Sequence, residues 1–130
     1  MMEVSLTVRV AEPGPGEEDA MTGGGMVAQV PATEVPADAY LLDVREDDEW
    51  DAGHVPGALH IPLGELGARY TEVERDRPLF VICRSGNRSA HAAHALAGAG
   101  WDARNVADGM KGWQAAGRPM TSESGNPYVA

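Results

Sequence analysis

From Met26 onward, the hydrophobic residues occur in short runs separated by polar or glycine-containing turns. Residues 79–82 are continuously apolar, which is typical of a central parallel strand buried on both faces. Four further runs, each short and apolar or β-branched at its centre, predict additional strands at residues 27–30, 40–45, 59–63 and 105–107. The chain therefore carries the hydrophobic pattern of a small sheet protein.

Segments of helical character lie between these runs. Residues 46–50 are mostly acidic, which suits the first turn of a helix, and residues 66–70 suit a short helix. Residues 89–97 are rich in alanine and are followed by glycines that would end a helix. Residues 110–116 predict a last helix. Strands that alternate with helices predict an α/β domain with a mostly parallel sheet.

Both ends of the chain lack this pattern. Residues 4–10 alternate apolar and polar side chains as a half-buried strand would, but residues 11–25 are rich in proline, glycine and acid, as linkers are. We expect a partly flexible N-terminal extension over residues 1–25, one domain over residues 26–119, and a C-terminal tail over residues 120–130.

Composition narrows the class of protein. The chain has 130 residues, which suits one domain, and a formal net charge of -10, which disfavours nucleic acid and anionic membranes as partners. No apolar run is long enough to span a membrane and no signal-peptide pattern is present, so we expect a cytoplasmic location. The single cysteine excludes an internal disulfide and a thiolate-rich zinc site. The four histidines match no metal pattern, and we expect neither a metal nor a cofactor.

That single cysteine, Cys83, follows the predicted central strand directly. Ligands bind beyond the carboxyl ends of parallel strands, and the next residues combine small side chains with two cations: Arg84, Ser85, Gly86, Asn87 and Arg88. A turn of this kind directs backbone N–H groups toward an anion, and the helix that follows adds the positive end of its dipole. The setting favours a thiolate, so we interpret Cys83 as a nucleophile and not as an inert core residue.

The segment Cys83-Arg84-Ser85-Gly86-Asn87-Arg88-Ser89 resembles the active-site loop of single-domain rhodaneses, the thiosulfate sulfurtransferase family. Segments 41–46, 53–58 and 106–113 resemble that family in the same order, so the resemblance covers residues 27–119. Asp108 departs from it, because many relatives have glycine there. The resemblance implies a three-layer rhodanese-like fold with a five-stranded, mainly parallel sheet, a persulfide on Cys83, and support of the loop by Asp43 and Arg45.

The residues of the loop are compatible with this chemistry. A Cys83 thiolate would attack the outer sulfur of thiosulfate or a similar sulfane-sulfur donor, held by residues 84–88, and would release sulfite. Sulfite is a stable anion, so the absence of Asp, Glu and His from the loop is no obstacle. With no second cysteine, the acceptor has to be external: cyanide, a thiol or a protein.

Two other interpretations stay open at this point. Cys83 could carry persulfide sulfur from one protein to another with little turnover of free thiosulfate. The spacing of Cys83 and Arg88 also resembles the loop of dual-specificity phosphatases that share this architecture. Those loops have one residue more, which makes room for a tetrahedral phosphate, and a phosphatase needs a general acid.

Overall fold

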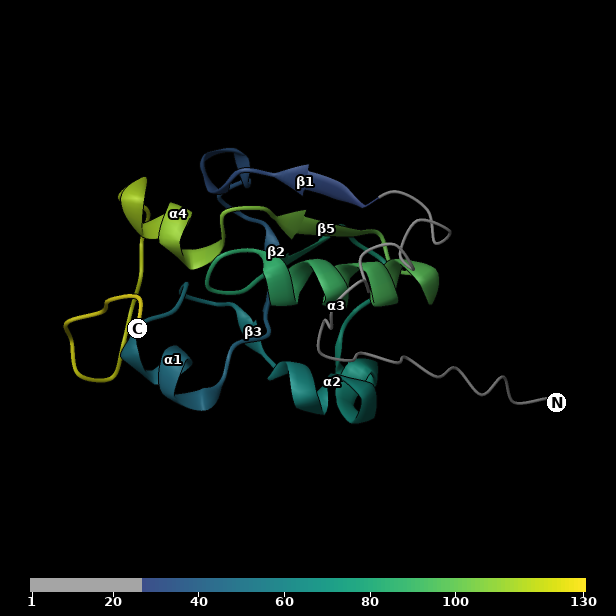
Figure 1. The fold of residues 1–130 in the computed structure, drawn as a ribbon, viewed down its shortest axis with the longest axis horizontal. Helices are drawn as coiled ribbons and strands as arrows, with labels where there is room; N and C mark the ends of the chain where they lie inside the picture. Colours follow the sequence, from purple (N-terminus) through teal and green to yellow (C-terminus); the bar gives the residue numbers. More distant parts are fainter. Residues whose placement is uncertain (1–26) are drawn as a thin grey trace, which may run out of the picture.

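Five short strands form one parallel sheet in the described part of the chain (Figure 1). The computed structural model describes residues 27–130, so the strand expected at residues 4–10 and the linker after it lie outside the described residues. The spatial order is β1-β5-β4-β2-β3. The strands are β1 (Ala28–Val30), β2 (Tyr40–Asp43), β3 (Leu59–His60), β4 (Leu79–Ile82) and β5 (Ala103–Val106).

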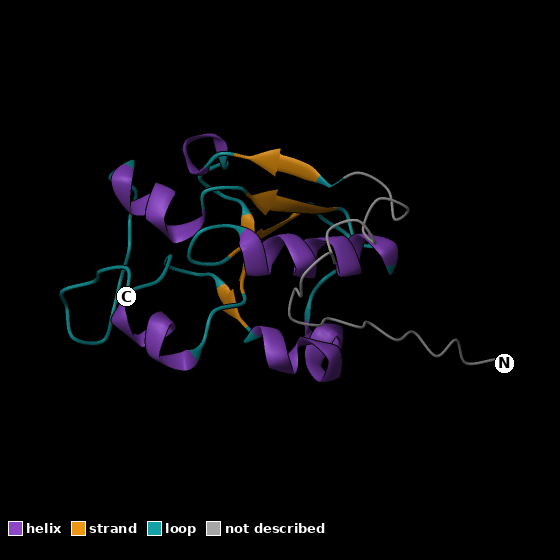
Figure 2. Ribbon diagram, viewed as in Figure 1, coloured by secondary structure: helices purple, strands orange, loops and turns teal. Residues whose placement is uncertain are grey.

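Helices cover both faces of this sheet (Figure 2). They are α1 (Asp47–Ala52), α2 (Leu63–Arg69), α3 (Asn87–Gly98) and α4 (Gly109–Ala115), with 3-10 turns η2 (Ala32–Glu34) and η3 (Tyr70–Glu72). Side chains of α2 and α3 share one buried cluster with the sheet, and those of η2 and α4 share another. The predicted three-layer α/β fold is confirmed. No helix in residues 27–130 is long and apolar enough to cross a membrane.

Strand β4 is the centre of the core, as its apolar run predicts. All four of its residues are buried. Leu79 and Val81 belong to the cluster on the α2 and α3 side, and Phe80 and Ile82 belong to the cluster on the α4 side, because successive side chains of a strand point to opposite faces. Cys83 continues the alternation and joins the α2 and α3 side with 1% exposure.

Element boundaries differ from the predictions where proline or glycine intervenes. The strand expected at residues 59–63 ends at His60, and helix α2 begins at Leu63 with Pro62 as its N-cap. Proline is common at the start of a helix because the N–H groups there have no partner within the helix. Helix α3 begins at Asn87, two residues before the expected start. Gly86 adopts φ 102°, turns the chain sharply and caps the helix there.

The tail at residues 120–130 packs back against the domain. Thr121 and His54 exchange two backbone hydrogen bonds of 2.9 and 2.8 Å, and the Tyr128 N–H donates to the Ala52 carbonyl at 3.0 Å. The Val129 N–H donates to Gln114 Oε1. The tail therefore runs beside α1 and ends near α4 (Figure 1), at the sheet edge to which the arrows of β1 and β5 point.

Candidate active site

Cys83 lies at the carboxyl end of β4, in the short turn that leads into α3. This turn is held against the start of α4 by two backbone hydrogen bonds: Met110 N–H to the Cys83 carbonyl at 2.7 Å, and Lys111 N–H to the Arg84 carbonyl at 3.0 Å. Gly109 makes the close approach possible, since a Cβ there would lie 2.5 Å from the Cys83 carbonyl oxygen. The predicted placement of Cys83 beyond the sheet therefore has a rigid backbone frame.

The thiol has two hydrogen-bond neighbours inside this frame. The Gly86 N–H donates to Sγ at 3.1 Å, and the Ser89 hydroxyl lies 3.3 Å from Sγ. Ser89 Oγ is also 2.6 Å from Asn105 Oδ1. A hydroxyl carries one proton, so Ser89 can donate to the sulfur or to Asn105 but not to both. A negative charge on Sγ would compete with Asn105 for that proton.

Asn105 connects this pair to the edge of the sheet. Its Nδ2 donates to the Gly86 carbonyl at 3.2 Å and to Gln29 Oε1 at 2.8 Å, which orients Oδ1 toward Ser89. The sequence predicts no site role for Gln29 or Asn105, and Ser89 enters only as the last residue of the loop motif. Asn105 could have been found, because it lies on β5, the neighbour of β4, and so near the same carboxyl edge as Cys83.

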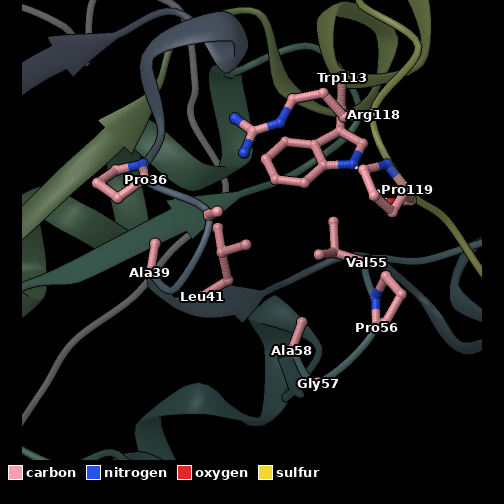
Figure 3. Close-up of a pocket in the computed structure, with 11 residues that line it drawn as sticks. Pro36, Ala39, Leu41, Val55, Pro56, Gly57, Ala58, Trp113, Arg118 and Pro119 are labelled. Carbon is pink, nitrogen blue, oxygen red and sulfur yellow. Dashed lines mark hydrogen bonds between the residues drawn. The ribbon is translucent and has the colours of Figure 1, made fainter.

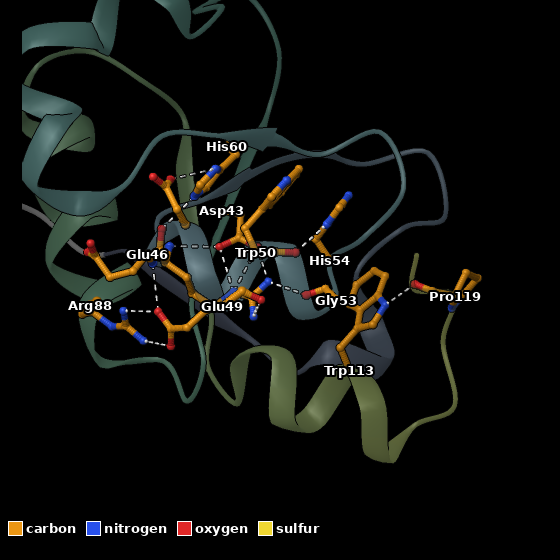
Figure 4. Close-up of polar contacts among 12 residues, drawn as sticks. Asp43, Glu46, Glu49, Trp50, Gly53, His54, His60, Arg88, Trp113 and Pro119 are labelled. Atoms are coloured by element: carbon orange, nitrogen blue, oxygen red, sulfur yellow. Dashed lines mark hydrogen bonds and ion pairs between the residues drawn. The ribbon is translucent and has the colours of Figure 1, made fainter. Parts of the chain in front are cut away.

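The two loop arginines have different environments. Arg84 is exposed, and its Nε donates to the Ala130 carbonyl at 2.9 Å. Arg88 is partly buried, and its Nη1 and Nη2 donate to the two carboxylate oxygens of Glu49 on α1 at 2.8 and 2.9 Å (Figure 4). Ser85 and Asn87 are exposed beside them. Of the two cations, Arg88 therefore has its charge balanced by a carboxylate.

The Glu49–Arg88 ion pair affects the acidity of both groups. Hydrogen bonds from Arg88 lower the pKa of the Glu49 carboxyl, although partial burial opposes the shift. Hydrogen bonding to Glu49 raises the pKa of the Arg88 guanidinium, and Coulombic attraction to Glu49 and to Cys83 adds to the effect. Both groups are charged at neutral pH, and Arg88 directly precedes Ser89, whose hydroxyl lies 3.3 Å from Cys83 Sγ.

Asp43 and Arg45 form a second, fully buried ion pair. Arg45 donates to both carboxylate oxygens of Asp43 through Nε and Nη2, with an Nη2–Oδ2 distance of 2.8 Å, and both side chains are 0% exposed. The same guanidinium donates to the carbonyls of Glu49 and Gly53. The end of β2 is thereby tied to the middle of α1, at Glu49, and to its C-cap, Gly53.

Two histidines enclose Trp50 on the other side of α1. The rings of His54 and His60 stack on its indole, with centroid separations of 3.6 and 4.6 Å. His54 Nδ1 lies 2.8 Å from the Trp50 carbonyl and His60 Nε2 lies 2.8 Å from the Arg45 carbonyl (Figure 4). A carbonyl only accepts, so each of these nitrogens carries a proton. Residues 27–130 contain no group of three His, Cys, Asp or Glu placed to hold a metal ion.

An apolar pocket of about 240 Å³ lies on the α4 side of the sheet (Figure 3). Its lining includes Leu41, Val55 and Trp113, and Arg118 lies over the Trp113 ring with 4.2 Å between the guanidinium carbon and the centroid. Arg118 donates to the Ala32 and Val35 carbonyls. Cys83 belongs to the cluster on the opposite side of the sheet, so this pocket is separate from the thiol.

Comparison with known proteins matches the whole described core. The model of the rhodanese-like domain family matches residues 29–116. "Putative sulfurtransferase YtwF" of Bacillus subtilis is 36% identical over 86 residues, which cover 66% of this chain and 84% of that protein. "Putative sulfur carrier protein YrkF" of the same organism is 42% identical over 74 residues, covering 56% of this chain but only 40% of that protein.

A solved structure shows the same architecture. The crystal structure of a rhodanese-related protein from Thermoplasma volcanium is 32% identical, with a TM-score of 0.70, and the match covers 74% of this chain and 99% of that one. The parallel sheet, the position of Cys83 and the family match over residues 29–116 agree with one another. The chain therefore belongs to the rhodanese-like domain family.

Proposed function

We propose that this protein is a sulfurtransferase that carries a sulfane sulfur on Cys83. The observation that carries the proposal is the environment of Sγ. It lies at the carboxyl end of the central strand, at the N-terminal end of the twelve-residue helix α3, with a backbone N–H at 3.1 Å and a hydroxyl at 3.3 Å. Such donors and the helix dipole stabilise an anionic sulfur, first as a thiolate and then as a persulfide.

The reaction divides into two displacements at sulfur. In the first, the Cys83 thiolate forms a bond to the terminal sulfur of a donor such as thiosulfate. The sulfur–sulfur bond of the donor breaks, and sulfite leaves with the bonding electron pair. In the second, cyanide or a thiolate takes the outer sulfur of the persulfide and Cys83 returns as a thiolate. Charge balances in both steps, and no proton has to be supplied to sulfite.

The surroundings of the loop are compatible with a mechanism that uses no general acid. The loop itself has no acidic group or histidine, and the Glu49 carboxylate is already engaged by Arg88. We assign Asp43 and Arg45 a supporting role, because their buried pair holds α1 in place and α1 presents Glu49 to the loop. Arg84, the exposed cation of the loop, is the group best placed to meet an incoming anion.

Burial of the thiol limits the class of donor. Cys83 is only 1% exposed, so a donor has to present a narrow terminal sulfur. Both thiosulfate and a persulfide on another molecule meet this condition.

The lone nucleophilic cysteine suits a reducing compartment, and we therefore propose a cytoplasmic location for the protein.

A role as a sulfur carrier between proteins is the second candidate. It is favoured by the relative named as a sulfur carrier, YrkF, and by the balanced charge of Arg88, which leaves less attraction for a small dianion. The two candidates share the Cys83 persulfide and differ only in the physiological donor and acceptor.

The experiment that tests the proposal is formation of thiocyanate from thiosulfate and cyanide by the wild-type protein and by Cys83→Ser. A serine hydroxyl is nearly the same size as the thiol but a poor nucleophile at neutral pH, so we expect the variant to fall to the uncatalysed background while keeping its circular dichroism spectrum. Weak thiosulfate turnover together with rapid sulfur exchange with a protein persulfide would favour the carrier. Full activity of Cys83→Ser would contradict both candidates.

A further inference from the structure

Arg88 lies in the loop between Gly86 and Ser89, the two residues that hydrogen-bond to Cys83 Sγ, yet its guanidinium is held by a carboxylate from another element. Glu49 is the third residue of α1, and it accepts from Arg88 with both oxygens while Oε1 also accepts from the Glu46 N–H at 2.8 Å. The backbone carbonyl of Glu49 is bound by the buried Arg45. Glu49 is thus fixed by its helix cap, by the Asp43–Arg45 pair and by Arg88.

The chemical consequence concerns the charge near the sulfur. An unpaired guanidinium in the loop that follows Cys83 would attract anionic reactants, because opposite charges interact strongly in a partly water-excluded site. The Glu49 and Arg88 side chains are only 15% and 24% exposed, so water screens them incompletely. Pairing therefore cancels most of the attraction that Arg88 would exert on a donor.

We propose that Glu49 is a specificity-determining residue, which lowers the reactivity of Cys83 toward highly anionic donors by neutralising Arg88. The inference rests on the proposed function, since it concerns the donor of the same Cys83 reaction. We infer that the wild-type site reacts faster with donors that carry little charge near the reacting sulfur than with the thiosulfate dianion. A persulfide at the end of a thiol carrier is such a donor. Glu49 acts through Arg88 and is a positioning residue.

The variant Glu49→Gln tests this inference. Glutamine keeps an oxygen that can accept from the Glu46 N–H and from Arg88, but it removes the negative charge. Asp51→Asn is the matched control, because it removes one charge from an exposed position on the same helix. The two variants change the net charge of the chain equally, so any difference between them arises from the position of the charge.

Two sets of probes report on reactant charge. Iodoacetate, an anion, and iodoacetamide, a neutral molecule of similar shape, both alkylate Cys83. The ratio of the iodoacetate rate to the iodoacetamide rate reports the effect of reactant charge and does not depend on sulfur transfer. We expect Glu49→Gln to raise that ratio about twofold, and to raise the rate of persulfide formation from the thiosulfate dianion about fivefold. We expect Asp51→Asn to stay near wild type in both. The gain of Glu49→Gln should disappear in a Glu49→Gln, Arg88→Met double variant.

Each outcome has a distinct meaning. An unchanged alkylation ratio in Glu49→Gln, or an equal gain in Asp51→Asn, would overturn the role of Glu49. A gain that persists without Arg88 would also overturn it, because the effect would not pass through the guanidinium. If the wild-type protein forms no persulfide with any donor, the proposed function fails, and the alkylation ratio still decides whether Glu49 controls the charge at Cys83.

Discussion

At the scale of single residues, we expect the buried Asp43–Arg45 pair to tolerate substitution poorly. Both side chains are 0% exposed, and Arg45 makes hydrogen bonds to Asp43, to the carbonyl of Glu49 in α1 and to the carbonyl of Gly53, the C-cap of α1. Removing one partner of a buried ion pair leaves the other charge without compensation, which costs about 3–5 kcal/mol. We expect Asp43→Asn to lower the free energy of unfolding in urea by about 3 kcal/mol.

Asp76→Asn is the control for that measurement, because it makes the same chemical change at an exposed position. It should alter the free energy of unfolding by less than about 0.5 kcal/mol. If Asp43→Asn were equally mild, the buried pair would not stabilise the position of α1, and its supporting role would have to be abandoned.

Individual contacts are also where sequence-based prediction reaches its limit. Cys83 could be predicted, because it is the only cysteine and follows an apolar run. Arg88 was expected to face an anion, and its pairing with Glu49 could not be predicted, because the two residues are 39 positions apart and Glu49 has the pattern of an ordinary helix-capping residue. Ser89 ends the loop motif, but its contact with Sγ could not be predicted, because the sequence does not show which way its hydroxyl points.

At the scale of elements, the junction of β4 and α3 depends on one backbone conformation. Gly86 adopts φ 102°, and a Cβ there would overlap the Ala107 carbonyl oxygen. A left-handed conformation alone costs an L-residue about 1–2 kcal/mol. We expect Gly86→Ala to lower the free energy of unfolding by about 2 kcal/mol or more. Persulfide formation should slow as well, because the Gly86 N–H donates to Sγ.

Gly98, at the other end of α3, provides the comparison. Nothing lies within 4 Å of a Cβ built there, so Gly98→Ala should stabilise the protein by about 0.5 kcal/mol through helix propensity. Thermal or urea unfolding distinguishes the two variants by sign. A mild Gly86→Ala variant with full activity would show that the turn adapts, and that its geometry is not required for the chemistry.

Elements were predicted better than contacts, for a physical reason. A buried central strand such as β4 needs a continuous apolar run, and an α-helix tends to end at glycine, so both leave local signals. The packing of the tail leaves none. It is held by backbone hydrogen bonds at Thr121 and Tyr128, which depend on no particular side chain, and so residues 120–130 show no periodic pattern.

At the scale of the whole molecule, the single cysteine and the net charge of -10 restrict how the protein can bind a sulfur donor and pass the sulfur on. The charge repels anionic reactants over distances of about 8 Å at physiological ionic strength, so attraction of a donor depends on the few cations near the loop. The single cysteine means that a sulfur accepted at Cys83 has no second thiol in the chain to receive it. Donor and acceptor therefore meet the same atom in turn.

The intact mass of the protein after incubation with thiosulfate is the most direct test of the Cys83 persulfide mechanism. We predict that the wild-type protein gains the mass of one sulfur atom, that peptide analysis places it on Cys83, and that added cyanide or thiol removes it and restores the original mass. Cys83→Ser should gain nothing under the same conditions. A wild-type mass that stays unchanged with thiosulfate and with persulfide donors, or a gain that survives in Cys83→Ser, would contradict the persulfide mechanism.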